Sequence, residues 1–233
     1  MGNFAGKAGM SEALFKFTGA CLGHRKGGVA MAAIGACAGF GAICGSSLAT
    51  AATMGKVALP ELRRLGYSGA LSTGTLAAGG TLGILIPPSV ILIIYSILTE
   101  QNIAKMFLAA FIPGILSALG YILAIALYVR FVKDSGPTKD RVGWKERLSL
   151  FKNIWQIILI FLVMIGGIYL GWFTPTEGGA IGAGGAGLIA ISNKNFKFKD
   201  LVEVIESTAI TSAMIFLVLL GAEFFNSFIA LTQ

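Results

Sequence analysis

The sequence predicts an all-α membrane protein, a polytopic bundle of helices that contains one re-entrant hairpin and one broken helix. Of its 233 residues, 55% are hydrophobic and only 12% are charged, and the mean hydropathy is +0.81. Soluble domains carry about 25% charged residues. Long charge-free stretches alternate with short basic loops, and 32 Gly and 6 Pro interrupt the apolar runs. This composition excludes a soluble enzyme.

The first charge-free stretch, residues 27–55, has basic residues on both sides. They are Arg25, Lys26, Lys56, Arg63 and Arg64. Basic loops of membrane proteins remain on the cytoplasmic side, so the stretch should enter and leave the membrane on the same face. We therefore predict a re-entrant hairpin over residues 27–60 that turns at Gly45, Ser46 and Ser47.

The second charge-free stretch, residues 65–99, is too long for one straight helix. Such a helix would measure roughly 50 Å, whereas the hydrocarbon core of a bilayer is ~30 Å thick. Pro87 and Pro88 lie inside the stretch and remove two backbone N–H donors. A residue that precedes proline also avoids the α conformation. We therefore predict a broken helix over residues 65–99, unwound around Thr81 to Ser89.

Further apolar segments follow. Residues 106–129 form a continuous span, and later spans are expected from about 153 to 173, from about 175 to 191 and from about 200 to 229. Basic side chains gather after the first of these spans, namely Arg130, Lys133, Lys139, Arg141, Lys145, Arg147 and Lys152. This loop is the strongest indication of the cytoplasmic side. The net charge of +7 thus arises in short loops and does not indicate a nucleic-acid partner.

The basic loop also divides the chain. We expect residues 1–132, with the hairpin and the broken helix, to form part of a first structural repeat. Residues 133–152 are then a basic cytoplasmic linker, and residues 153–233 begin a second repeat. Within the linker, residues 143–151 form either an amphipathic helix at the membrane interface or a solvated loop.

The hairpin tip and the helix break are where polar chemistry is expected. An unsatisfied backbone group in hydrocarbon costs several kcal/mol, so a turn at this depth is buried in protein or lines a cavity. Helix-end carbonyl groups and the hydroxyls of Ser46 and Ser47 suit a cation, and the N–H groups that begin the next helix suit an anion. A pair of interrupted helices is typical of a transporter's binding site. The alternative is that the small residues only allow close helix packing.

Several ordered motifs resemble those of one family. They are CGSSLATAATMG at 44–55, LPELRRLGY at 59–67, GILIPPS at 83–89 and FTPTE at 173–177. Over essentially its whole length, the chain resembles the large permease subunit of tripartite ATP-independent periplasmic (TRAP) transporters. It departs from the family at Ile84, where many relatives have another proline, and at Gly178 and Gly179, where they usually have alanine.

The resemblance implies part of an inverted-repeat elevator transporter in the bacterial inner membrane. Such a multi-pass permease is sodium-coupled and imports a small organic anion, such as a dicarboxylate, a sialic-acid-like compound or another carboxylate. It works with a small membrane subunit and a periplasmic substrate-binding protein. The family also has helices before the segment that begins at Met1, and a second hairpin and broken helix beyond Gln233. We therefore expect the chain to be a fragment that does not transport alone.

The resemblance also implies roles for individual residues at the two interruptions. One sodium ion would be held by six of them, Gly45, Ser46, Ser47, Thr81, Gly83 and Pro87. The substrate would be contacted by Ser47, Thr50 and Ser89. Two alternatives to a TRAP permease remain, a stand-alone sodium–carboxylate symporter and a membrane scaffold that does not transport.

Three other patterns have simpler explanations. Thr174, Pro175 and Glu177 are spaced as a capping box at a helix start, so a structural role is favoured over a functional intramembrane acid. The GxGxxG pattern at 182–187 lies in an apolar span and follows no predicted strand, which favours a helix-packing face over a dinucleotide site. A serine protease centred on Ser46 would need a nearby histidine base. The only histidine in the sequence, His24, lies in a basic loop.

Overall fold

The computed structural model describes residues 1–132, 135–193 and 196–232, and within them the chain is helical throughout. The prediction of an all-α protein is confirmed. The helices are α1 (Gly2–Lys7), α2 (Met10–Leu22), α3 (Gly28–Cys44), α4 (Ser47–Arg64), α5 (Gly69–Leu85), α6 (Val90–Leu98), α7 (Ile103–Phe131), α8 (Trp144–Asn153), α9 (Trp155–Tyr169), α10 (Pro175–Ser192) and α11 (Phe198–Thr232).

The chain separates into two compact units, Met1–Ser192 and Asn193–Gln233. The second contains α11, a helix of 35 residues that is long and apolar enough to cross a membrane. This division reflects packing, so the predicted repeat boundary at residues 133–152 stays a prediction.

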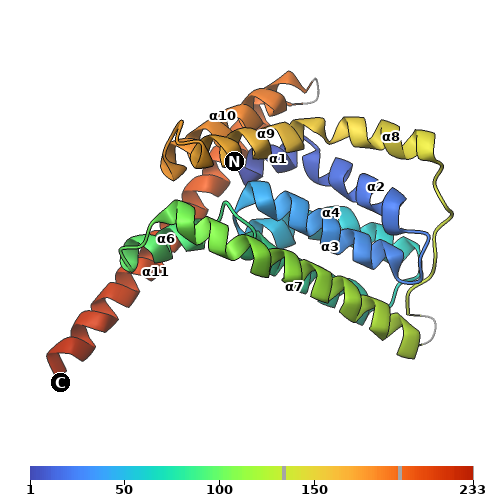
Figure 1. The fold of residues 1–233 in the computed structure, drawn as a ribbon, viewed down its shortest axis with the longest axis horizontal. Helices are drawn as coiled ribbons and strands as arrows, with labels where there is room; N and C mark the ends of the chain where they lie inside the picture. Colours follow the sequence, from blue (N-terminus) through green and yellow to red (C-terminus); the bar gives the residue numbers. More distant parts are fainter. Residues whose placement is uncertain (133–134, 194–195, 233) are drawn as a thin grey trace. The chain divides into compact units, whose positions relative to one another are not determined.

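In the first unit, α3, α4 and α5 pack closely together. Figure 1 shows α3 and α4 side by side, with α2 and α8 on one side and α7 on the other. The close approach depends on glycine: a Cβ atom added to Gly80 of α5 would lie 2.7 Å from Ala51 Cβ of α4. Phe40, Ile34 and Met54 are fully buried in this core. A rigid three-helix body therefore carries both the hairpin tip and the helix break.

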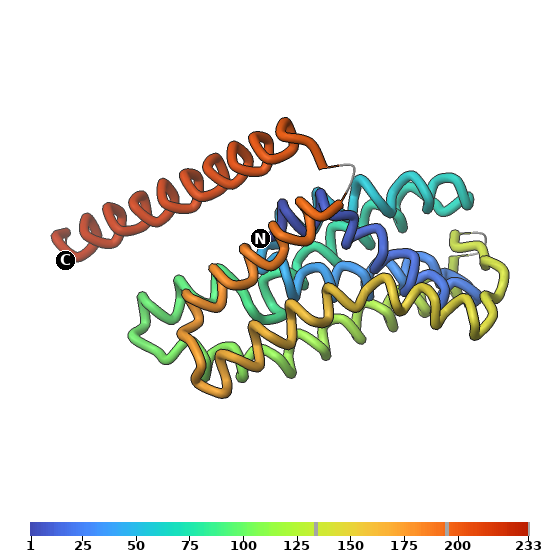
Figure 2. The backbone as a smooth tube through the Cα atoms, turned by 90° about the horizontal axis from the view of Figure 1, so that it is seen from above, coloured from blue at the N-terminus to red at the C-terminus, as the bar shows by residue number. Residues whose placement is uncertain are grey.

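By length and composition, two bent helix pairs and one long helix are the candidate membrane spans of this unit. The α7 helix has 29 residues and qualifies as a span by itself. The α5–α6 pair bends by 46° and the α8–α9 pair by 52°. In Figure 2, α6 turns back into α7 at one end of the unit, and α9 runs beside α10. The bend between α5 and α6 agrees with the predicted helix interruption, and the assignment of residues 65–99 to one broken membrane span stays a prediction.

The break is shorter than the sequence predicted. Ile86 leaves the helix with an extended backbone (ψ 119°) directly before Pro87, and α6 begins at Val90. The prediction that the unwound segment includes Thr81 and Gly83 is wrong, because both residues belong to α5. Prolines end a helix, whereas a glycine inside one is tolerated where neighbouring helices pack against it.

Residues 143–151 form a helix rather than a solvated loop. Trp144 and Leu148 on α8 are strongly exposed, and the ring of Phe151 lies 5.7 Å from that of Phe17 on α2. The guanidinium of Arg147 lies 5.5 Å from the centre of the Trp144 ring. The helical conformation is confirmed, and its place at the membrane interface stays a prediction.

The described part of the linker is fastened to the basic ends of the hairpin and of α5. The Gly27 N–H donates to the carbonyl oxygen of Gly136 at 3.0 Å, and the Tyr67 hydroxyl donates to that of Pro137 at 2.8 Å. Lys139 lies 3.4 Å from the carboxylate of Glu61. Hydrogen bonds from Arg64, and then from Lys139, lower the pKa of Glu61. Lys133, also assigned to the linker, lies outside the described residues.

The sequence predicts no helix before residue 27, yet the structure has α1 and α2 there. Gly9, with φ 80°, separates them. The signal for α2 is present in the sequence, since Met10 and Leu14 are buried four residues apart and Glu12 pairs with Lys16 at 2.7 Å on the exposed side. The α2 helix is short and only moderately amphipathic, which is why the pattern of charge-free stretches does not reveal it.

The two ends of the predicted hairpin should lie on the same side of the membrane. Both its ends carry exposed basic residues, so Lys26→Cys and Arg64→Cys, each in a background without Cys21, Cys37 and Cys44, should react with a membrane-impermeant thiol reagent from the cytoplasmic side alone. Labelling in right-side-out and inverted vesicles measures this. Reaction of the two positions from opposite sides would show that the segment between them crosses the membrane once, which excludes a re-entrant hairpin.

Candidate functional site

The α3 helix ends at Gly45, which has a left-handed backbone (φ 66°) and donates its N–H to the Gly41 carbonyl oxygen at 2.8 Å. Glycine adopts this conformation without the steric cost that a Cβ atom brings. Space requires it as well, because a Cβ atom here would lie 2.6 Å from the carbonyl oxygen of Pro88. Of the turn predicted at Gly45, Ser46 and Ser47, the structure confirms Gly45 and Ser46, whereas Ser47 is already the first residue of α4.

Ser46 caps the start of α4. Its side-chain oxygen accepts from the Ala49 N–H at 3.4 Å. Its carbonyl oxygen accepts twice from Thr50, from the backbone N–H at 3.0 Å and from the hydroxyl at 2.7 Å. Thr50 is fully buried, and Ser47, the first residue of α4, is half-buried. The hydroxyl groups of Ser46 and Thr50 therefore bond to main-chain groups of the tip itself.

The helix break between α5 and α6 has a similar design. Ser89 precedes α6, is fully buried and accepts from the Leu92 N–H at 3.4 Å. Pro87, also fully buried, and Pro88 supply carbonyl oxygens without N–H groups. No described residue donates a hydrogen bond to either proline carbonyl. The break therefore offers backbone oxygens with free acceptor capacity.

The hairpin tip and the helix break meet directly. The Val90 N–H, the first of α6, donates to the Gly45 carbonyl oxygen at 3.2 Å. Gly83 of α5 closes the junction from another side, since a Cβ atom there would lie 2.7 Å from both the carbonyl oxygen of Ser46 and the hydroxyl of Thr50. We call this meeting point of residues 45–50 and 83–90 the tip–break junction.

The junction combines two kinds of polar group. The C-terminus of α3 presents carbonyl groups with partial negative charge, and the N-termini of α4 and α6 present N–H groups with partial positive charge. Among the described residues, no three His, Cys, Asp or Glu side chains gather as they would around a metal. Any cation here would be held by hydroxyl and carbonyl oxygens.

The structure brings most, but not all, of the predicted site residues together. Residues in the junction are Gly45, Ser46, Ser47, Thr50, Gly83, Pro87 and Ser89. Thr81 is not brought there by any hydrogen bond: its hydroxyl donates to the Ala78 carbonyl oxygen at 2.7 Å and lies 3.1 Å from the Tyr121 hydroxyl of α7. Thr81 therefore connects α5 with α7. The binding roles of all these residues stay predictions.

No sequence motif singles out Gly41, a residue of α3 that lies at the junction. A Cβ atom on Gly41 would lie 2.8 Å from Gly83 Cα, so α3 and α5 touch through two glycines just before the tip and the break. The available signal was position alone: Gly41 precedes Gly45 by one helical turn, and Gly83 precedes Pro87 by the same spacing.

The other patterns have the structural roles expected of them. The Glu177 carboxylate accepts from the Thr174 N–H at 2.7 Å, and the Thr174 hydroxyl oxygen accepts from the Glu177 N–H at 3.3 Å, which completes the capping box. The GxGxxG segment lies within α10, where Gly182 packs against Met164 of α9. His24 lies before α3 and Ser46 after it, so a helix roughly 25 Å long separates them.

Comparison with known proteins shows which family this chain matches. Residues 1–233 match the family model described as "Tripartite ATP-independent periplasmic transporter, DctM component". The chain is 39% identical over 201 residues to the C4-dicarboxylate TRAP transporter large permease protein DctM of Pseudomonas aeruginosa, which covers 86% of this chain and 45% of that protein.

Relatives with other substrates in their names are also similar. Identity is 35% over 232 residues with the sialic acid TRAP transporter permease protein SiaT of Haemophilus influenzae, covering 97% of this chain and 36% of that protein. Identity is 30% over 215 residues with the ectoine TRAP transporter large permease protein TeaC of Halomonas elongata, covering 92% of this chain and 50% of that protein. The chain spans about half the length of the curated relatives it matches.

Proposed function

Because the chain belongs to the family of large permease components of tripartite ATP-independent periplasmic transporters, we propose that it forms part of a sodium-coupled permease that imports a small organic anion. It is a multi-pass protein of the bacterial inner membrane and not an enzyme. The proposed coupling and substrate class rest on the tip–break junction.

The hydrogen bond from Val90 to the Gly45 carbonyl oxygen carries the proposal. It joins two helix interruptions that lie far apart in the sequence. Each interruption exposes polar backbone that needs a partner at membrane depth. Because the two meet, their oxygens and N–H groups form a single polar site, as expected where a transporter binds its ion and its substrate.

Sodium is the proposed cation. The hydroxyls of Ser46 and Ser47 and the carbonyl oxygens of Pro87 and its neighbours are uncharged ligands, and a half-helix C-terminus adds partial negative charge. An anion is the proposed substrate, because α4 and α6 both begin at the junction and helix N-termini favour negative charge. Ser47 would serve both, with Thr50 and Ser89 supporting the substrate side.

Transport would use an elevator movement and two partners. The close glycine packing of α3, α4 and α5 would let this body carry the junction as one rigid element. The partners would be a small membrane subunit and a periplasmic substrate-binding protein. Relatives are named for C4-dicarboxylate, sialic acid and ectoine, which all carry a carboxylate, and for isethionate, a sulfonate, so the proposed substrate class is a small organic anion.

An uptake assay tests this proposal. The complete transporter is reconstituted in liposomes, and uptake of labelled C4-dicarboxylate and sialic acid is measured with and without a sodium gradient and an added binding protein. We expect uptake only when both are present. Uptake without the binding protein would favour a stand-alone symporter, and no uptake of any carboxylate beside an active relative in the same assay would favour a scaffold.

A further inference from the structure

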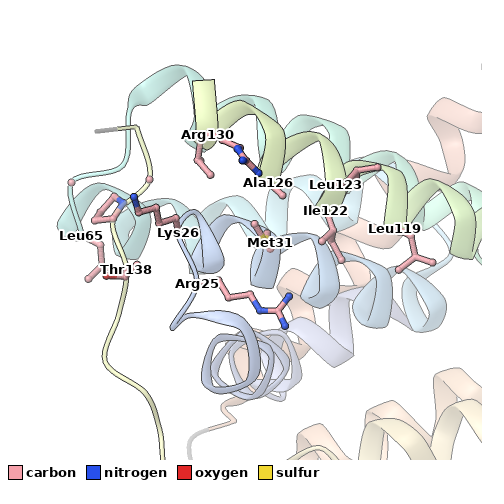
Figure 3. A pocket seen from close by; sticks show the side chains of 14 residues that line it. Arg25, Lys26, Met31, Leu65, Leu119, Ile122, Leu123, Ala126, Arg130 and Thr138 are labelled. Atoms are coloured by element: carbon pink, nitrogen blue, oxygen red, sulfur yellow. The ribbon is translucent and has the colours of Figure 1, made fainter. Parts of the chain in front are cut away.

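A large groove lies on the basic side of the first unit, away from the tip–break junction. Its volume is 1190 Å³, and its walls come from the start of α3, the segment after α4, the second half of α7 and the docked linker. Figure 3 shows Lys26 and Arg130 toward one end of the groove, Arg25 apart from them beyond Met31, and the side chains of Leu119, Ile122 and Leu123 along α7.

The polar end of the groove carries charge of one sign. Arg25, Lys26 and Arg130 are exposed, and none of them forms an ion pair with a described residue. Among the described residues that line the groove there is no aspartate or glutamate, and Glu61, at the end of α4, is already paired with Arg64 and Lys139. Three cations without a described ion-pair partner therefore line this groove.

The other end of the groove is apolar and elongated. Leu119, Ile122, Leu123 and Ala126 line it at the spacing of one helix face, and Arg130 follows one turn later. Along α7 the wall thus changes from purely hydrocarbon to cationic over roughly 15 Å. Such a change matches the passage from acyl chain to head group in a bilayer leaflet.

We propose that this groove binds an anionic phospholipid of the cytoplasmic leaflet. The phosphate would lie among the three cations, and an acyl chain would lie along the apolar face of α7. The basic flanks place this end of the molecule on the cytoplasmic side, where basic pockets between membrane helices recognise anionic head groups. A lipid there would connect the hairpin, α7 and the linker without taking part in the tip–break junction.

Native mass spectrometry of the purified full chain with added phosphatidylglycerol or phosphatidylcholine tests the site. We expect phosphatidylglycerol to bind preferentially. The variant with Arg25→Gln, Lys26→Gln and Arg130→Gln should lose roughly fivefold in affinity for each cation removed, or roughly a hundredfold in total. The matched control, Arg63→Gln with Arg141→Gln and Lys145→Gln, removes the same charge outside the groove and should bind as the wild type does.

A second pair of variants separates lipid from free phosphate. Ala126→Trp fills the apolar end without changing charge and should reduce phosphatidylglycerol binding, whereas Leu127→Trp, on an exposed face of α7, should not. Glycerol phosphate should not compete with the lipid. Equal binding by the charge variant and its control, or competition by glycerol phosphate at the lipid's own concentration, would overturn the proposal.

A photo-crosslinking amino acid at Leu123 identifies the occupant in native membranes. We expect an adduct with phospholipid. An adduct with a polypeptide would show that a protein segment fills the groove, and the lipid proposal would be wrong.

Discussion

Replacing Gly45 by alanine should lower the free energy of unfolding by about 2–5 kcal/mol and abolish transport. A left-handed backbone costs a non-glycine residue about 1–2 kcal/mol, and overpacking adds about 1–3 kcal/mol. Both apply here, because φ is 66° and the new Cβ atom would lie 2.6 Å from the Pro88 carbonyl oxygen. To relieve the contact, the hairpin tip would have to move away from the helix break.

Thermal unfolding in detergent measures this effect, and we expect the midpoint to fall by roughly 5–15 °C. Gly55→Ala is the matched control, because Gly55 lies in the same hairpin and a Cβ atom there has nothing within 4 Å. In a helix interior that change should stabilise by about 0.5–1 kcal/mol. Equal midpoints for the two variants would show that Gly45 does not hold the junction together.

Ser46→Ala and Ser47→Ala should each raise the sodium concentration for half-maximal uptake by roughly ten- to a hundredfold. A lost contact to a charged group is worth ~1.5–3 kcal/mol, which corresponds to that range. Both hydroxyls lie at the start of α4, beside the carbonyl groups that end α3. The maximal rate at saturating sodium should change less, because the variants retain the backbone of the tip.

Ser68→Ala controls for the loss of a helix cap. The Ser68 hydroxyl oxygen caps α5 by accepting from the Leu71 N–H at 3.3 Å. The Ser46 cap has nearly the same geometry, with the Ala49 N–H at 3.4 Å. Ser68, however, lies on the basic side of the protein. We expect normal sodium dependence in Ser68→Ala. If all three variants shift alike, the effect reflects helix stability rather than ion binding.

The elements with strong local causes could be predicted from the sequence. A left-handed glycine followed by capping serines ends one helix and begins another, and two prolines remove N–H donors, so the turn at Gly45 and the break at Pro87 follow from short-range chemistry. The extent of the break could not be predicted. Gly83 remains helical where α3 and α4 pack against it, and Thr81 lies on another side of α5, facing Tyr121 of α7, which only the tertiary structure shows.

Long-range contacts account for the other features that the sequence did not show. The bond between Val90 and Gly45 and the docking of the linker through Pro137 depend on how separate helices pack. The groove between α3 and α7 arises in the same way, since Arg25 and Arg130 lie far apart in the chain but line one opening. Charge patterning placed these residues on one side of the membrane but could not bring them together.

Hydrogen–deuterium exchange of the complete permease in sodium and in potassium tests most directly whether the tip–break junction is one ion site. We expect sodium to slow exchange both at residues 45–50 and at residues 86–92. Half-maximal protection of the two segments should occur at the same sodium concentration. The α9–α10 pair should not respond. Equal exchange in the two salts, or protection of one segment without the other, would contradict the central claim that the hairpin tip and the helix break bind sodium jointly.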